Sequence, residues 1–341
     1  MKRILLYIYV LAAFTLASCE HDPLCLTHEE HALKYHVNLA ATWRLDWEEN
    51  VNNHIDWEAN WPQNYLEYNS LRPTKPDGLR VVNNTKDGGT HIFNISPDGG
   101  LIYLSEGHNN MLLYNNNTEY IVFTEMNSVA TTRATTRTRT RATYSGNPFD
   151  TRDQEEETVN PPDMLFGNYI EGYVPEKLQF APTLETTLHP LVFTYKVRFE
   201  FSEGLEYVAL ARGALSGMAM SVQMSTGKTS DEVATILYDC EVTDYGARAL
   251  VNSFGAPGYP NPNYTKGEPI YGLNLEVRMK NGVLKSFDFD ITDQIKAQPH
   301  GGVITVSGLK ITKEEGTSNT GGFTVDINDW GEYEDIEIPL I

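Results

Sequence analysis

The chain has 341 residues, with 26 Lys and Arg against 46 Asp and Glu, which gives a net charge of −20 at pH 7. This acidic balance argues against nucleic-acid binding, which needs a basic surface, and against electrostatic docking on anionic lipid. The length is sufficient for two domains with sizeable hydrophobic cores.

The start of the chain has the pattern of a bacterial lipoprotein signal. Lys2 and Arg3 precede an apolar run over residues 4–16, which is shorter than the roughly 20 residues that a membrane-spanning helix requires. The run ends in the tetrapeptide Leu16-Ala17-Ser18-Cys19. This tetrapeptide matches the lipobox of bacterial lipoproteins, in which the peptide is cut before a cysteine and the cysteine is acylated.

We therefore predict a signal peptide over residues 1–18, cleavage between Ser18 and Cys19, and a covalent lipid such as palmitate on Cys19. Several acyl chains, at about 0.8 kcal/mol per buried methylene, would hold the mature protein on a membrane. Loss of Lys2 and Arg3 changes the net charge from −20 to −22, which leaves the lipid as the membrane contact. The alternative is an ordinary secretory signal with a chance cysteine.

Residues 19–35 are predicted to be a polar, lipidated tether. His28 and His31 have a spacing that would suit a metal on a helix, but no acidic or cysteine ligands complete a set. We expect no metal site and no cofactor other than the covalent lipid. Beyond Cys19 the chain has Cys25 and Cys240, and the sequence leaves open whether they form a disulfide or remain two thiols.

Residues 36–127 are predicted to form the first β-sandwich. Apolar and polar side chains alternate over residues 37–47, which is the period of a half-buried strand. Two hairpins are expected to follow, because each pair of apolar runs is separated by turn residues. The predicted pairs are 91–95 with 101–104, and 111–114 with 120–123.

Residues 128–160 break this pattern and are predicted to be a linker or loop. A run of Thr and Arg over 130–143 is followed by an acidic patch over 150–157. Low apolar content and high charge predict a mobile segment between two domains. Exposed arginines in such a segment would be accessible to an Arg-specific protease.

Residues 161–341 are predicted to form the second β-sandwich. Apolar residues alternate over 191–201, and Asn281-Gly282 supplies the positive-φ residues of a type I′ turn between strands at 273–279 and 283–291. A single helical turn is expected over residues 292–296. No long amphipathic helix is apparent, so the predicted fold class is all-β, with two antiparallel β-sandwich domains in tandem.

The sequence contains no catalytic motif, and we expect the protein not to be an enzyme. Asp288, Asp290 and Asp293 are the most concentrated acidic group, and the alternation with Phe287 and Phe289 places the first two on the solvent face of a strand. The tryptophans at 43 and 47 share an apolar strand face and are assigned to the core. Trp57 and Trp61 lie in loop-like sequence and are the candidates for ligand contact.

Short segments with no catalytic role occur in a fixed order along the mature chain: 19–25, 113–121, 161–165, 215–219, and 287–294 with Asp329-Trp330. On these segments the chain resembles the Bacteroidetes lipoproteins related to fimbrillins, which include fimbrial anchor and accessory subunits. The resemblance implies two transthyretin-like β-sandwiches, export to the outer membrane and strand exchange with neighbouring subunits. The Thr/Arg run departs from the family's usual protease-trimming position, which favours a subunit that stays anchored.

We therefore expect a lipid-anchored, surface-exposed outer-membrane protein that serves as a fimbrial anchor, accessory or adhesion subunit. Its partners would be fimbrial or other surface proteins, bound by strand addition in which Ile336, Ile338 and Leu340 take part. The alternative is a surface glycan-binding lipoprotein that uses Trp57 and Trp61. The sequence does not decide which subunit is met or on which face of the membrane.

Overall fold

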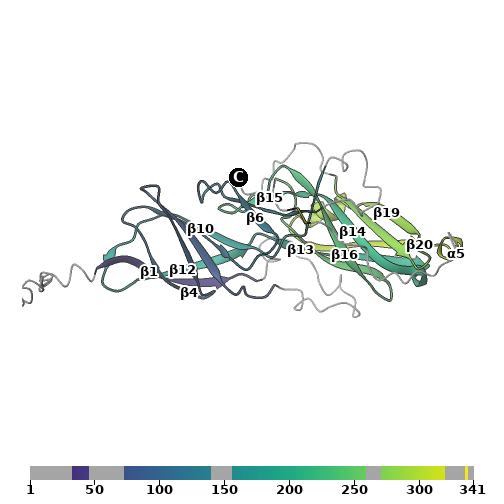
Figure 1. Cartoon of the computed structure of the whole chain (residues 1–341), viewed down its shortest axis with the longest axis horizontal. Coiled ribbons are helices and arrows are strands. Elements are labelled where there is room, and N and C mark those ends of the chain that lie inside the picture. Colours follow the sequence, from purple (N-terminus) through teal and green to yellow (C-terminus); the bar gives the residue numbers. More distant parts are fainter. Residues whose placement is uncertain (1–32, 46–72, 140–155, 259–269, 319–334, 337–341) are drawn as a thin grey trace, which may run out of the picture.

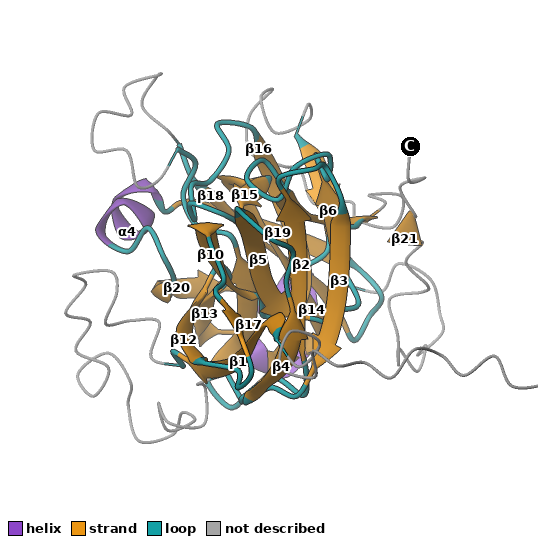
Figure 2. Ribbon diagram, turned by 90° about the vertical axis from the view of Figure 1, so that its left-hand side faces the viewer, coloured by secondary structure: helices purple, strands orange, loops and turns teal. Residues whose placement is uncertain are grey.

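In a computed structural model of the chain, residues 33–45, 73–139, 156–258, 270–318 and 335–336 are described. These residues form an elongated molecule with two β-sheet halves arranged end to end (Figure 1). Seen from one end, the strands make up the body and the short helix α4 (Thr292–Ala297) lies at its periphery (Figure 2). The predicted all-β tandem fold is confirmed.

The described residues of the N-terminal half form eight strands in the order β11-β1-β12-β10-β5-β2-β3, with β4 paired to β1. Their bounds are β1 Lys34–Trp43, β2 Leu79–Thr85, β3 Thr90–Ile95, β4 Gly99–Tyr103, β5 Asn109–Asn115, β10 Phe166–Tyr173, β11 Lys177–Leu178 and β12 Thr183–Pro190. Alternate side chains of these strands fill one core, which includes Val37, Leu39, Val81, Ile102 and Leu113. The alternation predicted from residue 37 onward is thus the inward face of β1.

The C-terminal half is a larger assembly in the order β19-β18-β14-β16-β17-β13-β20. The bounds are β13 Phe193–Glu203, β14 Val208–Ala219, β16 Val233–Val242, β17 Gly246–Ser253, β18 Gly272–Met279, β19 Leu284–Asp290 and β20 Gly302–Lys310. A 3-10 turn (Leu205–Tyr207) precedes β14, and α5 (Lys313–Thr317) follows β20. Tyr195, Val197 and Phe199 of β13 face Leu273 and Leu275 of β18 across the core.

A separate three-stranded sheet joins the halves, in the order β15-β7-β6. Its strands are β6 (Ile121–Thr124), β7 (Arg133–Thr136) and β15 (Ser221–Gln223), so β7 pairs with one strand from before the linker position and one from the C-terminal half. The apolar cluster around it combines both halves, because Leu112 and Ala134 pack with Val222 and Phe254. The halves therefore share a continuous core at the joint.

The predicted linker over residues 128–160 is wrong in its described parts. Besides β7, it contributes β8 (Thr138–Arg139) and β9 (Glu157–Val159), and β9 lies parallel to β16. The run forms strand because threonine is β-branched and suits a pleated sheet. Residues 140–155 lie outside the described part of the chain.

The predicted domain boundary at residue 161 also needs correction. Strands β10, β11 and β12 belong to the N-terminal half, since β10 pairs with β5 and β12 runs parallel to β1. Apart from β8 and β9, which join the C-terminal sheet through β16, the C-terminal half therefore starts at β13. The connection before β10 is fixed by side chains: Asp163 Oδ2 accepts the N–H of Glu119 at 2.6 Å, and Asn252 Nδ2 donates to the Pro162 carbonyl at 3.1 Å.

Of the three predicted hairpins, one is confirmed. Strands β18 and β19 pair in register across Asn281-Gly282, and Gly282 has a φ of 84°. Asn281 does not have a positive φ, so the predicted type I′ turn is wrong although the hairpin is present. The run 91–95 instead pairs with β2 and the run 101–103 with β1, while β5 and β6 lie in different sheets. Local turn signals were present, but the strand after each turn pairs with a strand other than the one before the turn. Three strand pairs are parallel, β1–β12, β13–β20 and β9–β16, where only antiparallel pairing was expected.

Candidate functional site

No group of three or more His, Cys, Asp or Glu side chains suited to a metal occurs in the described residues. Asp288 accepts a hydrogen bond from Asn274 Nδ2 at 2.5 Å, and Asp290 accepts the N–H of Thr292 at 2.9 Å, so both carboxylates have structural partners. None of the helices among the described residues is long and apolar enough to cross a membrane.

Several predicted site residues lie outside the described part of the chain: Ser18, Cys19, Cys25, Trp57, Trp61, Ile338 and Leu340. Their roles stay predictions. Ile336 lies in the two-residue strand β21 (Asp335–Ile336), and Cys240 is a free thiol whose pKa is raised by burial.

The C-terminal strand β21 is paired at the margin of the C-terminal sheet. Ile336 is opposite Thr138 and Asp335 is opposite Arg139, so β21 extends the series β16-β9-β8. Beneath this margin the Arg139 guanidinium donates to the Leu237 carbonyl at 3.0 Å. The first two residues of the segment predicted to take part in strand exchange, Asp335 and Ile336, thus occupy a β-pairing position within their own chain.

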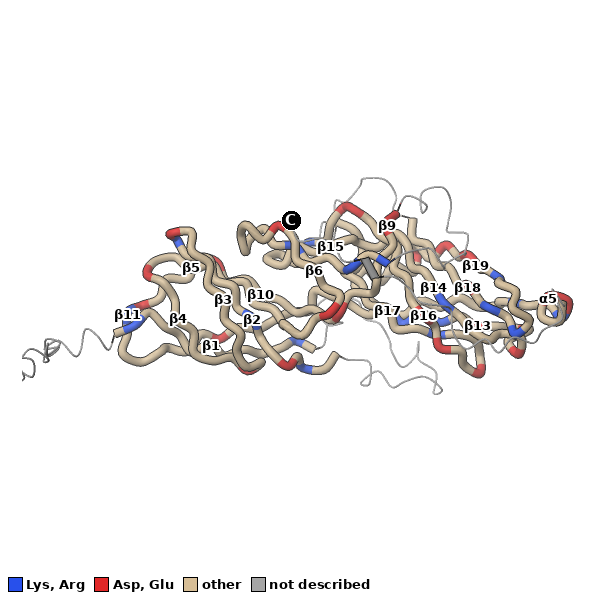
Figure 3. The backbone as a smooth tube through the Cα atoms, viewed as in Figure 1, with Lys and Arg blue, Asp and Glu red and all other residues tan. Residues whose placement is uncertain are grey.

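Among the described residues of the N-terminal half, two consecutive strands form sheet edges that no other strand covers. Among the described residues β3 pairs only with β2 and β4 only with β1, and the turn between them closes with a Ser96–Gly99 bridge. Gly99 is required there, because a Cβ would lie 1.9 Å from the Leu39 carbonyl oxygen. Neither strand contains a charged residue or a proline (Figure 3). Ile92 is 58% exposed and Tyr103 is 51% exposed.

Natural proteins normally protect such edges with charge, proline, bulges or a covering segment, because unpaired backbone groups invite another strand. The C-terminal half does so. Its edge strand β19 carries Lys285, Asp288 and Asp290, and the pairing of the other edge strand, β20, is interrupted by register shifts.

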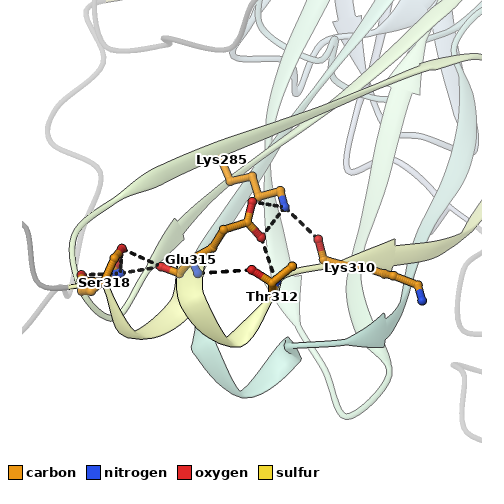
Figure 4. A network of polar contacts seen from close by, with 6 residues as sticks. Lys285, Lys310, Thr312, Glu315 and Ser318 are labelled. Atoms are coloured by element: carbon orange, nitrogen blue, oxygen red, sulfur yellow. Dashed lines mark hydrogen bonds and ion pairs between the residues drawn. The ribbon is translucent and has the colours of Figure 1, made fainter.

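Helix α5 lies across the ends of these two edge strands, and a polar network holds it there (Figure 4). Lys285 Nζ of β19 lies 2.7 and 2.8 Å from the Glu315 carboxylate oxygens and donates to the Lys310 carbonyl of β20 at 2.9 Å. Glu315 and Thr312 form a reciprocal capping box at the start of α5. The pKa of Glu315 is held below its ordinary value, chiefly by the Lys285 ammonium.

A cleft of about 340 Å³ opens at the joint between the halves, a size within the usual range for small-ligand sites. Its walls include Tyr169, His189, Phe193 and His300, and the last two rings stack with centroids 4.2 Å apart. Burial lowers the pKa of His300 to about 3, and burial with the nearby Arg44 lowers that of His189. Both rings are neutral at pH 7, so the cleft is aromatic and uncharged.

Together these features define the class of the protein: an all-β protein whose described residues form two sheet-built halves in tandem. Residues 65–239, slightly more than half of the chain, match the family model described as "Domain of unknown function (DUF5119)". The chain belongs to this family. No curated protein matches it.

Solved structures show where the same fold occurs. A candidate adhesin of Bacteroides ovatus has 20% identity and a TM-score of 0.55, over 82% of this chain and 93% of that one. The fimbrial anchor protein Mfa2 of Porphyromonas gingivalis has 13% identity and a TM-score of 0.44, over 80% and 90%. The fimbrillin-related resemblance is confirmed at the level of the fold.

The two uncharged edge strands β3 and β4 were not predicted from the sequence, although the sequence contains a signal for them. Residues 90–95 and 99–103 have no charged side chain, whereas the strand at 284–290 carries three. The absence of charge was uninformative until the topology showed which strands are edges.

Proposed function

We propose that this protein is a non-catalytic adhesion or fimbrial subunit, anchored to the outer membrane through a lipid on Cys19 and binding surface proteins by strand addition. The similarity to an adhesin fold supports a role in contact. The fimbrial anchor protein named above suggests the kind of assembly in which such a subunit would act. The lipobox around Cys19 supports the anchor.

The observation that carries the proposal is that β3 and β4 are edge strands without charged side chains of their own. In strand addition, a partner's extended segment bonds to unpaired backbone groups, and pockets for alternate side chains fix its register. Each edge strand offers backbone groups and carries no charged side chain of its own, and Ile92 of β3 and Tyr103 of β4 offer apolar contact. The edges of the C-terminal half do not offer this.

The first test introduces one positive charge on each of the two edge strands. We expect the double variant Ile92→Lys/Tyr103→Lys to lose co-purification with fimbrial subunits from outer membranes, since desolvating a lysine opposes strand pairing. Both side chains are exposed, so the fold should tolerate the change. The matched control is Leu250→Lys, an exposed apolar residue on the interior strand β17, where Lys196 of β13 lies opposite it. Equal co-purification of the two variants would refute the edge as the docking position.

The C-terminal segment and the anchor are tested separately. Deleting residues 335–341 should abolish co-purification while the protein stays folded and membrane-bound; unchanged co-purification would remove this segment from the proposal. For the anchor, Cys19→Ala should prevent incorporation of labelled fatty acid and release the protein from the membrane. Retention of the label would exclude lipid attachment at this residue.

The cleft supports glycan binding as a second function. Sugars bind through stacking on aromatic rings and through hydrogen bonds to neutral polar groups, and this cleft has aromatic walls together with Asn168, Ser225 and Thr226. If the cleft is the site, Tyr169→Ala should weaken binding of soluble glycans. If the loop tryptophans are the site, Trp57→Ala or Trp61→Ala should do so. No glycan binding by the parent protein would dismiss this function.

A further inference from the structure

The end of the N-terminal half carries two unusually exposed apolar side chains on one short loop. Phe180 is 79% exposed and Val174 is 54% exposed. Between them, β11 pairs with the first residues of β1: Leu178 is opposite Lys34 and Lys177 is opposite Tyr35. The loop is therefore fixed beside the point at which the described chain begins.

This end of the molecule is also the one nearest to the predicted anchor along the chain. Cys19 precedes Lys34 by 15 residues. Fully extended, 15 residues span at most roughly 50 Å, so the loop stays within that distance of the lipid. Strand β11 lies at the left end of the molecule and α5 at the opposite end (Figures 1 and 3).

The composition of the loop suits the boundary between lipid headgroups and acyl chains. Aromatic residues favour this boundary, and lysines reach from it toward water with their charged ends. Pro175 and Pro182 bracket the loop and restrict its backbone, so holding Phe180 in place requires less loss of conformational entropy. Around this end Lys34 and Lys177 are matched by Glu106 and Glu176, which favours an uncharged, zwitterionic lipid surface over an anionic one.

We propose that the loop over residues 174–182 is a membrane foot that inserts Phe180 and Val174 into the interfacial region of the bilayer to which Cys19 is attached. The proposal rests on the lipid anchor proposed above. Two apolar side chains would bind a bilayer only weakly from solution. A short tether raises the effective concentration to the millimolar range, and weak insertion is then sufficient to orient the protein. The C-terminal half would point away from the membrane.

The test uses the acylated full-length protein in phosphatidylcholine vesicles. Phe180→Cys is labelled with an environment-sensitive nitrobenzoxadiazole fluorophore, and Lys313→Cys on α5 is the matched control at the far end. The parent protein labelled in parallel gives the background from its native cysteines. We expect a several-fold increase in emission at position 180 on anchoring, and quenching by lipids that carry a nitroxide on the acyl chain. Position 313 should show neither.

The outcomes separate the foot from the anchor. Protein that floats with the vesicles but gives the same unquenched emission at positions 180 and 313 would overturn the foot and leave the anchor intact. Protein that does not float would overturn both. Hydrogen exchange on the unmutated chain is the second measurement: amides over residues 176–181 should be protected on vesicles relative to detergent, and equal exchange would count against the foot.

Discussion

The two halves of the molecule share a β-sandwich architecture but treat the ends of their sheets differently. In the N-terminal half, β3 and β4 end the sheets with uncharged sequence and exposed apolar side chains. In the C-terminal half, charged side chains, register shifts and the network around α5 protect β19 and β20. An unprotected edge is a liability unless a partner covers it. Under the function proposed above, the contrast favours the N-terminal half as the half that accepts a partner's strand.

The two halves also differ in the charged groups buried in their interiors. The C-terminal half contains a buried ion pair on neighbouring strands: Arg212 of β14 lies opposite Glu276 of β18, with Nη2 and Oε2 2.6 Å apart and both side chains 1% exposed. The apolar cluster of the N-terminal half has no such pair among the ion pairs of the described residues.

The largest expected effect comes from breaking this buried pair. Glu276→Ala leaves the Arg212 charge buried without its carboxylate, which typically costs about 3–5 kcal/mol of unfolding free energy. Urea unfolding should show a lower midpoint concentration for the variant, and the unfolding free energy calculated from it should fall by this amount. The control is Glu203→Ala, which removes a pair with Lys310 in which both side chains are more than half exposed, and should cost at most about 1 kcal/mol. Similar losses for the two variants would contradict the structural role of the buried pair.

A second contrast between the halves is expected in their response to acid. The pKa of His300 is lowered to about 3 by burial against Phe193, while an unfolded histidine titrates near 6.5. Its contribution is complete above pH 6.5 and is lost as pH falls toward 3, because the unfolded chain binds the proton first. The loss should reach about 3 kcal/mol by pH 4.

The measurement compares urea unfolding at pH 7 and pH 4 for the parent, His300→Gln and His91→Gln. The His300 variant should lose less stability between the two pH values than the parent. His91 is an exposed residue on β3, so its variant should follow the parent. An unchanged pH dependence in the His300 variant would show that burial of this ring does not control acid stability.

Much of the local structure could be predicted from the sequence, because alternation reports which side chains face a core. The strand from residue 37, the strand over 191–201 and the turn at Asn281-Gly282 all correspond to observed elements. The helical turn predicted at residue 292 corresponds to α4. Each of these signals depends only on neighbours within a few residues.

Which strands pair with each other could not be predicted in this way, because strand pairing depends on contacts between distant segments. Strand β12 lies beside β1 although about 145 residues separate Thr42 from Thr187, and no periodicity within either strand encodes that pairing. The prediction of a linker from the Thr/Arg run was wrong for a related reason. Arg139 is buried because its guanidinium reaches the Leu237 carbonyl, a contact that composition cannot reveal.

The smallest expected effect is at the protected edge of the C-terminal half, where Glu315 joins α5 to β19. Glu315→Gln keeps an acceptor for the Thr312 N–H but removes the ion pair with Lys285, and its partial exposure limits the cost to about 0.5 kcal/mol at pH 7. Because the pKa of Glu315 is depressed in the folded protein, this contribution is present above its ordinary pKa and lost as pH falls through the folded value. The stability difference between parent and variant should therefore shrink as the pH falls through the folded pKa of Glu315. Hydrogen exchange should also become faster over residues 284–288 and remain unchanged over β3; faster exchange in both places would mean that the two edges are not independent.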